Sequence, residues 1–215
     1  MKDAQSAPAA GRTNWRRFAV AVGVPTAVAG GLVVALAQGA LAANITVSGT
    51  QFKLTADHLE GRGFTQYGGA VTDVSGKTTY DATSGIQHAD LYNLCQSVNA
   101  GVFVLKITAA TDAKYDAANP ADSAKNAVQA DDLLIGMSEL GGDATFKNIQ
   151  IGLDASTLNA DGQATHGRAG TFGQQASGVS IENLKQQAYL TTASSFKLKG
   201  MSLKLLFGGT KDECY

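Results

Sequence analysis

Two serines that follow a Gly-Met pair are the residues closest to a covalent chemistry. Gly136-Met137-Ser138-Glu139-Leu140 and Gly200-Met201-Ser202-Leu203-Lys204 each match part of the Gly-x-Ser-x-Gly elbow of esterases. In that elbow a strained turn lifts a nucleophilic serine towards a histidine. Both segments lack the second glycine, and Ser202 lies in a strand-like pattern with no helix after it. The sequence therefore favours a non-catalytic protein, and we assign no catalytic residue.

Metal binding is the second chemistry that the residue types allow. The three histidines, His58, His88 and His166, do not have the spacing that brings two ligands to one metal ion. Asp131-Asp132 and Asp143 supply the oxygen atoms that calcium prefers, but they match neither the EF-hand pattern nor the glycine-rich β-roll pattern. We therefore expect no metal and no cofactor, and we expect these carboxylates to lie in solvated turns.

The two cysteines, Cys95 and Cys214, are predicted to form one disulfide. Both follow an export-like N-terminal segment, and disulfides persist in oxidising compartments. The bridge would close a loop of about 120 residues and stabilise the fold by at most roughly 4–5 kcal/mol in the chain-entropy picture.

The segments that would position these residues have mainly β character. Alternate residues are apolar in 201–207 and 149–153, which is the pattern of half-buried strands. Residues 102–107 form a denser apolar run, expected as a strand covered on both faces. Shorter strands are expected at 45–47, 52–54, 128–130 and 179–181. Residues 183–190 are expected to form a short helix, and residues 111–126 and 159–178 long loops.

Together these segments predict a single mainly β domain over residues 43–215. Its strands would form a β-roll or solenoid-like stack, or a sandwich of antiparallel strands. Short echoes such as Ala56-Asp57-His58-Leu59 and Ala130-Asp131-Asp132-Leu133 suggest similar edges presented repeatedly. Their irregular spacing establishes no fixed-period repeat, and chance explains such echoes equally well.

Residues 1–42 have the composition of an export segment. They carry four basic residues and one acidic residue, followed by an uncharged apolar run over 18–37. Ala40-Leu41-Ala42 ends the segment with a small-x-small site, which predicts a signal peptide cleaved between Ala42 and Ala43. The run of 20 residues is also long enough to span a bilayer as one hydrophobic helix, so a retained anchor is the alternative. Arg16-Arg17 leaves the twin-arginine route open beside the general one.

The charge distribution narrows the choice of partners. The chain of 215 residues has a net charge of −1, and residues 43–215 contain 13 basic and 17 acidic side chains. Such a domain has no basic field to attract a phosphate backbone, so we expect no nucleic-acid partner. Self-association, a membrane partner and an apolar ligand are the partners that we consider instead. We expect the domain to be secreted or held at the cell envelope.

Several motifs resemble a family of exported actinobacterial proteins classed as a domain of unknown function. Among them are Asn93-Leu94-Cys95-Gln96-Ser97 and the terminal Glu213-Cys214-Tyr215. The others lie at 15–18, 37–42, 47–53, 63–68, 144–149 and 173–176. The resemblance covers nearly the whole chain and implies export and a small multi-span membrane protein as a partner. Members are often labelled "cholesterol esterase" without a recognisable catalytic motif.

Three functions follow as hypotheses. The first is a non-catalytic envelope protein that self-associates, binds a membrane partner or holds an apolar, lipid-like ligand. The second is a lipid or sterol esterase, implied only by the family label. The third is a structural protein of the cell surface.

Overall fold

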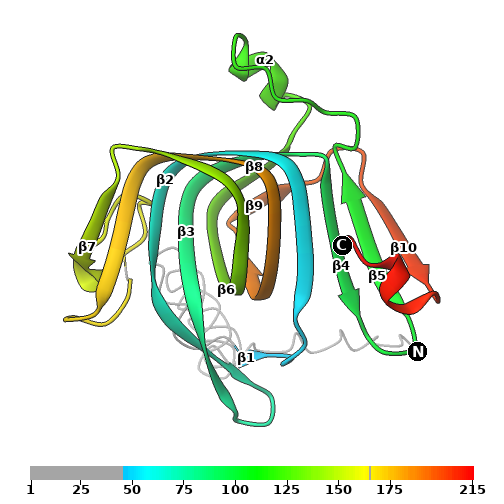
Figure 1. Cartoon of the computed structure of the whole chain (residues 1–215), viewed down its shortest axis with the longest axis horizontal. Helices are drawn as coiled ribbons and strands as arrows, with labels where there is room; N and C mark the ends of the chain where they lie inside the picture. The colour runs from blue at the N-terminus through cyan, green and yellow to red at the C-terminus, as the bar shows by residue number, and fades with distance from the viewer. Residues whose placement is uncertain (1–45, 165) are drawn as a thin grey trace, which may run out of the picture. The chain divides into compact units, whose positions relative to one another are not determined.

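Four long antiparallel strands close into a barrel (Figure 1). They are β2 (Phe52–Asp73), β3 (Thr78–Tyr92), β6 (Val128–Lys147) and β8 (Phe172–Thr192). β2 pairs with β3, β3 with β6, β6 with β8, and β8 with β2 again. This computed structural model describes residues 46–164 and 166–215. The expected N-terminal helix and the Ala42–Ala43 cleavage site lie outside the described residues.

Shorter elements flank the barrel. The strands are β1 (Thr46–Val47), β4 (Leu94–Asn99), β5 (Val104–Ala109), β7 (Gln150–Asp154), β9 (Ser195–Lys197) and β10 (Ser202–Leu206). The helical turns are α2 (Pro120–Ala124), η2 (Ala155–Thr157) and η3 (Gly209–Asp212). We call the antiparallel extension formed by β4, β5 and β10 the wing. Within 46–164 and 166–215, no helix has the length and apolarity to cross a bilayer.

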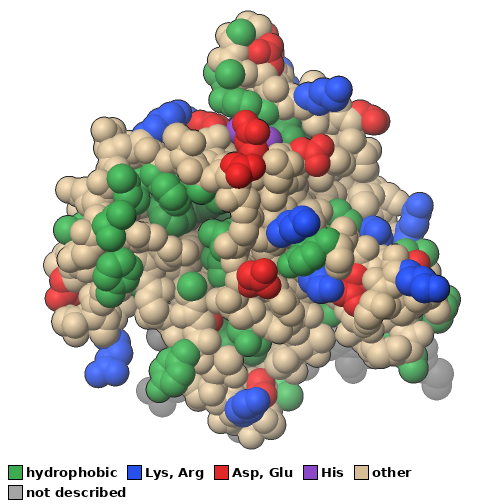
Figure 2. All heavy atoms as spheres, in the orientation of Figure 1, with side chains coloured by type: hydrophobic (Ala, Val, Ile, Leu, Met, Phe, Trp, Pro, Cys, Tyr) green, Lys and Arg blue, Asp and Glu red, His purple; other side chains and the backbone are tan. Residues whose placement is uncertain are grey.

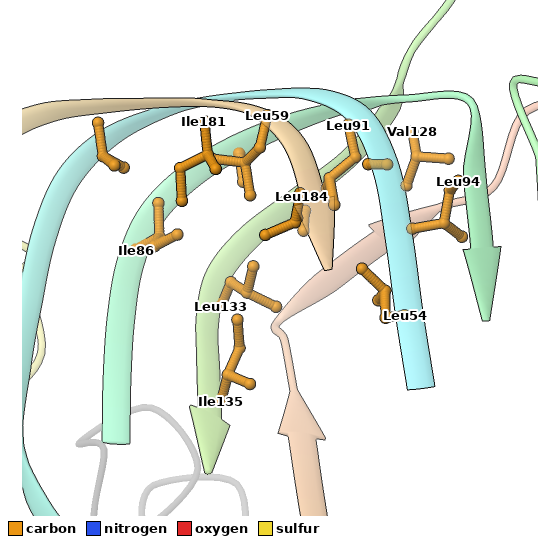
Figure 3. Packing of buried hydrophobic residues seen from close by; sticks show 14 of the residues in the cluster. Leu54, Leu59, Ile86, Leu91, Leu94, Val128, Leu133, Ile135, Ile181 and Leu184 are labelled. Atoms are coloured by element: carbon orange, nitrogen blue, oxygen red, sulfur yellow. The ribbon is translucent and has the colours of Figure 1, made fainter. Parts of the chain in front are cut away.

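Apolar side chains fill the barrel. The labelled leucines, isoleucines and valine of Figure 3 extend from β2, β3, β4, β6 and β8 into the space that the strands enclose. Phe64 is the largest apolar side chain of this cluster, and Ala89, Val128 and Ala130 are completely buried in it. Small alanines beside large leucines let the walls approach closely at interior packing density. The interior of the barrel is therefore a packed hydrophobic core.

The inward-facing positions change parity along each long strand. In β6, Val128 and Ala130 face the core, and then Leu133 and Ile135 do so. Between them Asp132 has a left-handed backbone, with φ of 50°. One left-handed residue reverses the face on which the following side chains lie, so the core spacing is three there and two elsewhere. The same three-residue step, again with a left-handed residue inside it, separates Gly61 from Phe64, Leu91 from Leu94 and Ile181 from Leu184. It also separates Ala56 from Leu59, Ile86 from Ala89 and Ala176 from Val179, where no residue has a positive φ.

These steps line up across neighbouring strands as two rows, which we call the corners. The strand registers place Ala110, Asn93, Asp57, Asn183 and Gly142 in the first corner. They place Asp132, Gln87, Gly63, Ser177 and Asn148 in the second corner. Both rows contain residues with a positive φ angle. At these residues φ lies between 50° and 64°, except at Gly142, where φ is 142°. The long strands bend over the core in Figure 1, and the corners give the sheet local reversals that allow such bending.

Polar side chains join adjacent strands along the corners. In the first corner, Asn93 Nδ2 donates to Asp57 Oδ2 at 2.9 Å. In the second, Asn148 Nδ2 donates to Ser177 Oγ at 2.9 Å. Asn and Asp adopt the left-handed region more readily than other non-glycine residues, which explains their presence in these rows. The echoes Ala-Asp-His-Leu and Ala-Asp-Asp-Leu are therefore corner sequences, with apolar residues three apart around a polar turn.

The structure corrects several expectations. The sheet is a closed barrel instead of a β-roll, a solenoid or a sandwich. The helix expected over 183–190 is wrong, because these residues continue β8. Ile181, Leu184 and Ala188 face the core with the i, i+3, i+7 spacing of a helix, and the corner at Asn183 produces that spacing.

Two further boundaries differ from expectation. The loop expected to end at residue 178 ends before Phe172, where β8 begins. The run over 102–107 becomes β5 only from Val104, and its middle residues are half-buried and not covered on both faces. The long loop expected over 111–126 is confirmed, between β5 and β6, with the single turn α2 inside it.

The predicted disulfide is confirmed between Cys95 in β4 and Cys214 near the C-terminus, with a Cα–Cα distance of 5.8 Å. The same tail makes a Lys53–Glu213 ion pair at 2.7 Å, and the Cys214 N–H donates to Ser97 Oγ at 3.0 Å. The bridge and these bonds hold the C-terminus across one face of the wing.

A valine at a corner tests the role of the left-handed residues. Asn183 is exposed in the middle of β8, so strand propensity alone favours Asn183→Val. Because its φ is 54°, we expect Asn183→Val to lower the free energy of unfolding by about 1–2 kcal/mol. Asn183→Gly should stay within a few tenths of wild type. Urea unfolding of the oxidised protein measures both. Glu182→Val, at the neighbouring exposed position, is the control, and equal stability of the two valine variants would contradict the corner account.

Candidate functional site

The most buried polar cluster contains His166, Asp161 and Thr65. Asp161 is completely buried, and Thr65 Oγ1 donates to its Oδ2 at 2.6 Å. His166 Nε2 lies 2.7 Å from Asp161 Oδ1, and the Gln163 N–H donates to the same oxygen at 3.2 Å. Gly85 leaves the necessary room, because a Cβ there would lie 1.9 Å from Asp161 Oδ2. This cluster ties the loop between η2 and β8 to the barrel wall.

Ionisation in this cluster follows from burial and hydrogen bonding. Burial opposes the charge on Asp161, but the hydrogen bonds from His166 and Thr65 outweigh it and hold the Asp161 pKa below its usual value. Burial, followed by the nearby charges of Asp161 and Asp81, raises the pKa of Tyr67 to about 12. Near neutral pH the carboxyl group of Asp161 is ionised and the phenol of Tyr67 is protonated. We call the hydrogen-bonded cluster of His166, Asp161 and Thr65 the clasp, because it fastens the loop to the barrel wall.

His58 belongs to a second cluster at the end of the barrel. Its ring stacks on Tyr115, with centroids 3.9 Å apart and planes at 8°. Glu60 Oε2 and Ser180 Oγ each lie 3.5 Å from the same nitrogen, Nε2. A serine triad needs its acid and its nucleophile on opposite ring nitrogens, so this arrangement lacks the geometry of a triad. His58 instead anchors the long loop that carries Tyr115.

His88 braces two strands of the barrel. It is the register partner of Asp131, and its Nδ1 lies 2.6 Å from Asp131 Oδ1. Its Nε2 lies 3.4 Å from Asp90 Oδ1. The hydrogen bond to His88 is the main reason that the pKa of Asp131 is lowered. Both ring nitrogens thus face carboxylates, which leaves no nitrogen directed at a nucleophile.

The remaining residues singled out in the sequence are dispersed. Ser138 Oγ accepts from Gln51 Nε2 at 2.6 Å and donates to the Gln187 carbonyl at 3.3 Å. Ser202 starts β10 opposite Thr108. Asp132 accepts from Ser194 and Asp143 from Asn183, so both are engaged at or beside the corners. Throughout the described part of the chain, no three His, Cys, Asp or Glu side chains gather as metal ligands.

The outer edge of the wing is a different kind of candidate site. In the described ranges β10 pairs with β5 alone. Leu203 and Leu205 on β10 are 53% and 54% exposed, and their register partners Ile107 and Leu105 are half-buried beside them. We call Leu203, Leu205, Leu105 and Ile107 the wing ridge. The alternation over 201–207 correctly predicted a strand, but it gave no sign that the apolar face points outwards.

A second apolar edge lies across the barrel at β7. Ile151 there is 67% exposed, and Phe172 at the start of β8 is also exposed. Figure 2 shows hydrophobic side chains gathered over the β7–β8 side of the molecule. The described surface also has hollows, among them one of about 600 Å³ lined by residues 142–145, Ser180 and Glu182 and one of about 290 Å³ lined by residues 110–114 and Lys199.

The clasp predicts a specific acid response. Asp161→Asn should lower the free energy of unfolding at pH 7 by roughly 1–3 kcal/mol, because it weakens a buried charged network. In the wild type the folded pKa is depressed, so this contribution is present above the unfolded carboxyl pKa of about 3.9 and disappears as the pH falls through the folded value.

Urea unfolding at pH 7 and between pH 5 and 2 measures this response, with the exposed Asp143→Asn as control. Asp161→Asn should lose less stability on acidification than wild type does. Parallel acid profiles for Asp161→Asn and wild type would contradict the role assigned to the clasp.

Comparison with known proteins places the chain at the level of a family. A model described as a family of unknown function (DUF6230) matches residues 48–215. This range includes both cysteines and every described strand except β1. No curated protein and no solved structure matches the chain. The family description names no activity, so the esterase label stays a prediction. The matched range covers most of the sequence, and the chain belongs to this family of unknown function.

Proposed function

We propose that the protein is a non-catalytic component of the cell envelope that self-associates through the edge strand β10. The wing ridge carries this proposal. An edge strand presents a row of backbone N–H and C=O groups that can pair with another strand. On β10 that edge runs beside two leucines that are more than half exposed.

The sequence of β10 suits pairing with a second copy of itself. In an antiparallel pair with its two-fold axis at Leu205, Leu205 faces its own equivalent. The pairing ends at Leu206, the last residue of β10, so Phe207 lies outside it. Lys204 then faces Leu206, so no lysine opposes a lysine. A two-fold interface requires this kind of self-complementarity. A second copy is therefore the occupant that we propose for this edge.

The packing of the core argues against the other roles. An apolar ligand would need an empty, dry interior, and side chains occupy the interior of this barrel. An esterase would need a serine beside a correctly oriented histidine. His88 and His166 contact carboxylates instead, and at His58 the carboxylate and the serine both approach the same nitrogen. The esterase role and the multi-span membrane partner thus rest on the resemblance alone.

Export is part of the same proposal. The disulfide between Cys95 and Cys214 is consistent with an oxidising compartment. The apolar run over 18–37 and the arginines before it supply the route. With three Pro and 25 Gly, the chain provides turns and corners without the composition of a flexible linker.

A charge on the wing ridge tests the proposal. Sedimentation velocity of the full chain in mild detergent should show a reversible dimer. Leu205→Lys should weaken it by about a hundredfold or more, because each buried leucine contributes about 1.5–3 kcal/mol and occurs twice at the axis. Ile151→Lys, at the other apolar edge, is the matched control and should leave the dimer intact.

Cross-linking checks the register of the pair. Leu205→Cys should give an inter-chain disulfide, since opposed residues of antiparallel strands lie close enough to bridge. Lys204→Cys should not. A wild-type monomer at high concentration would refute self-association. Loss of association in Ile151→Lys would instead indicate head-to-tail assembly through β7 and contradict the two-fold pair.

A further inference from the structure

Four large apolar side chains stand out by their exposure. Tyr80 is 87% exposed, and Val74, Val102 and Phe207 are each 78% exposed. Val74 lies in the turn between β2 and β3, and Tyr80 is near the start of β3. Val102 lies in the turn between β4 and β5, and Phe207 directly follows β10. None of the four belongs to the wing ridge. They are the tips of projecting segments.

The segments that carry them lie at one end of the described unit. Leu206 pairs with Val104, so the end of β10 and the β4–β5 turn are neighbours. In Figure 1 both lie at the lower end of the view, as does the β2–β3 hairpin, whereas α2 lies at the upper end. Figure 2 shows hydrophobic side chains projecting on the hairpin at that lower end. We call Val74, Tyr80, Val102 and Phe207 the apolar tips.

The described chain also enters at this end. Thr46 and Val47 form β1, which pairs with Thr72 and Asp73 next to the turn of the β2–β3 hairpin. In the sequence, the apolar run over 18–37 precedes Thr46 by only eight residues. A fully extended linker of that length spans about 30 Å. A bilayer that holds the run is therefore within reach of the hairpin, whereas α2 is at the far end.

Tyr80 suits the surface of a bilayer, because aromatic rings with a polar end are preferred at the level of the headgroups. Two exposed lysines lie at this end, each beside a carboxylate: Lys77 in the hairpin turn beside Asp73, and Lys211 in η3 before Asp212. The charges at this end therefore nearly balance, and the apolar side chains carry the argument.

We propose that, in the form of the protein that retains residues 18–37 as a membrane anchor, the apolar tips form a surface that contacts the same lipid bilayer. Val74, Val102 and Phe207 insert at the acyl boundary and Tyr80 stays at headgroup level. The individual contacts are weak, but the short tether keeps the local lipid concentration high. A second copy is the other possible occupant of such tips, and the experiment separates the two.

Tryptophan depth measurements test this surface. Trp15 is the single tryptophan of the chain, so Trp15→Phe removes all tryptophan fluorescence from the protein. Into it we place one tryptophan at a time at positions 74, 80, 102 and 207, with Ala121→Trp on the exposed turn α2 as the matched control. The full chain is reconstituted in phosphatidylcholine–phosphatidylglycerol vesicles with and without brominated phosphatidylcholine. The readouts are the emission maximum and the bromine quenching.

We expect blue-shifted emission and bromine quenching at the four tip positions and neither at position 121. No quenching at the tips, or equal quenching at position 121, would overturn the proposal. A blue shift that grows with protein density and is insensitive to brominated lipid would assign the tips to a protein contact, and so overturn it too. Leu205→Lys should leave the tip quenching unchanged, which separates this result from the dimer of β10.

Discussion

Closure of the sheet by pairing of β2 with β8 is the constraint on which the rest of the structure depends. These strands come from opposite ends of the described chain, and their ladder runs from Phe52–Ala188 to Tyr67–Gly173. Without it the apolar sides of β2, β3, β6 and β8 would face water. Such long strands can close around so narrow a core because the two corners reverse their inward faces. Closure of the barrel therefore depends on the two corners.

Closure also decides where function can reside. A barrel of four strands has room for side chains alone, so chemistry and recognition belong to its outside. The three histidines each work there as part of a structural contact: His166 and Asp161 fasten one loop, His58 and Tyr115 another, and His88 joins β3 to β6. The edge strand β10 with its exposed leucines and the apolar tips also lie on the outside of the barrel.

Much of the architecture could be predicted from the sequence, and the failures share a cause. The mainly β class, the strand over 201–207, the loop before β6 and the Cys95–Cys214 bridge follow from alternation, turn residues and cysteine count. Only short pieces of β2, β6 and β8 are predicted, at 52–54, 128–130 and 179–181, and β3 is not predicted, because the three-residue steps at the corners break the period of two. At Asn183 the break even imitates a helix. Strand pairing over more than a hundred residues, such as β2 with β8, leaves no local pattern. Nor does the outward direction of the β10 leucines, which depends on which face the barrel covers.

Amide hydrogen exchange along β2 tests the closed barrel most directly. β2 has β3 on one side and β8 on the other, so amides bonded to either neighbour belong to one cooperative unit if the sheet is closed. The account predicts that both sets exchange at the slow rate of global unfolding and become equally faster when denaturant is added. Fast exchange of the β2–β8 amides, with the β2–β3 amides still protected, would show an open sheet and contradict the account.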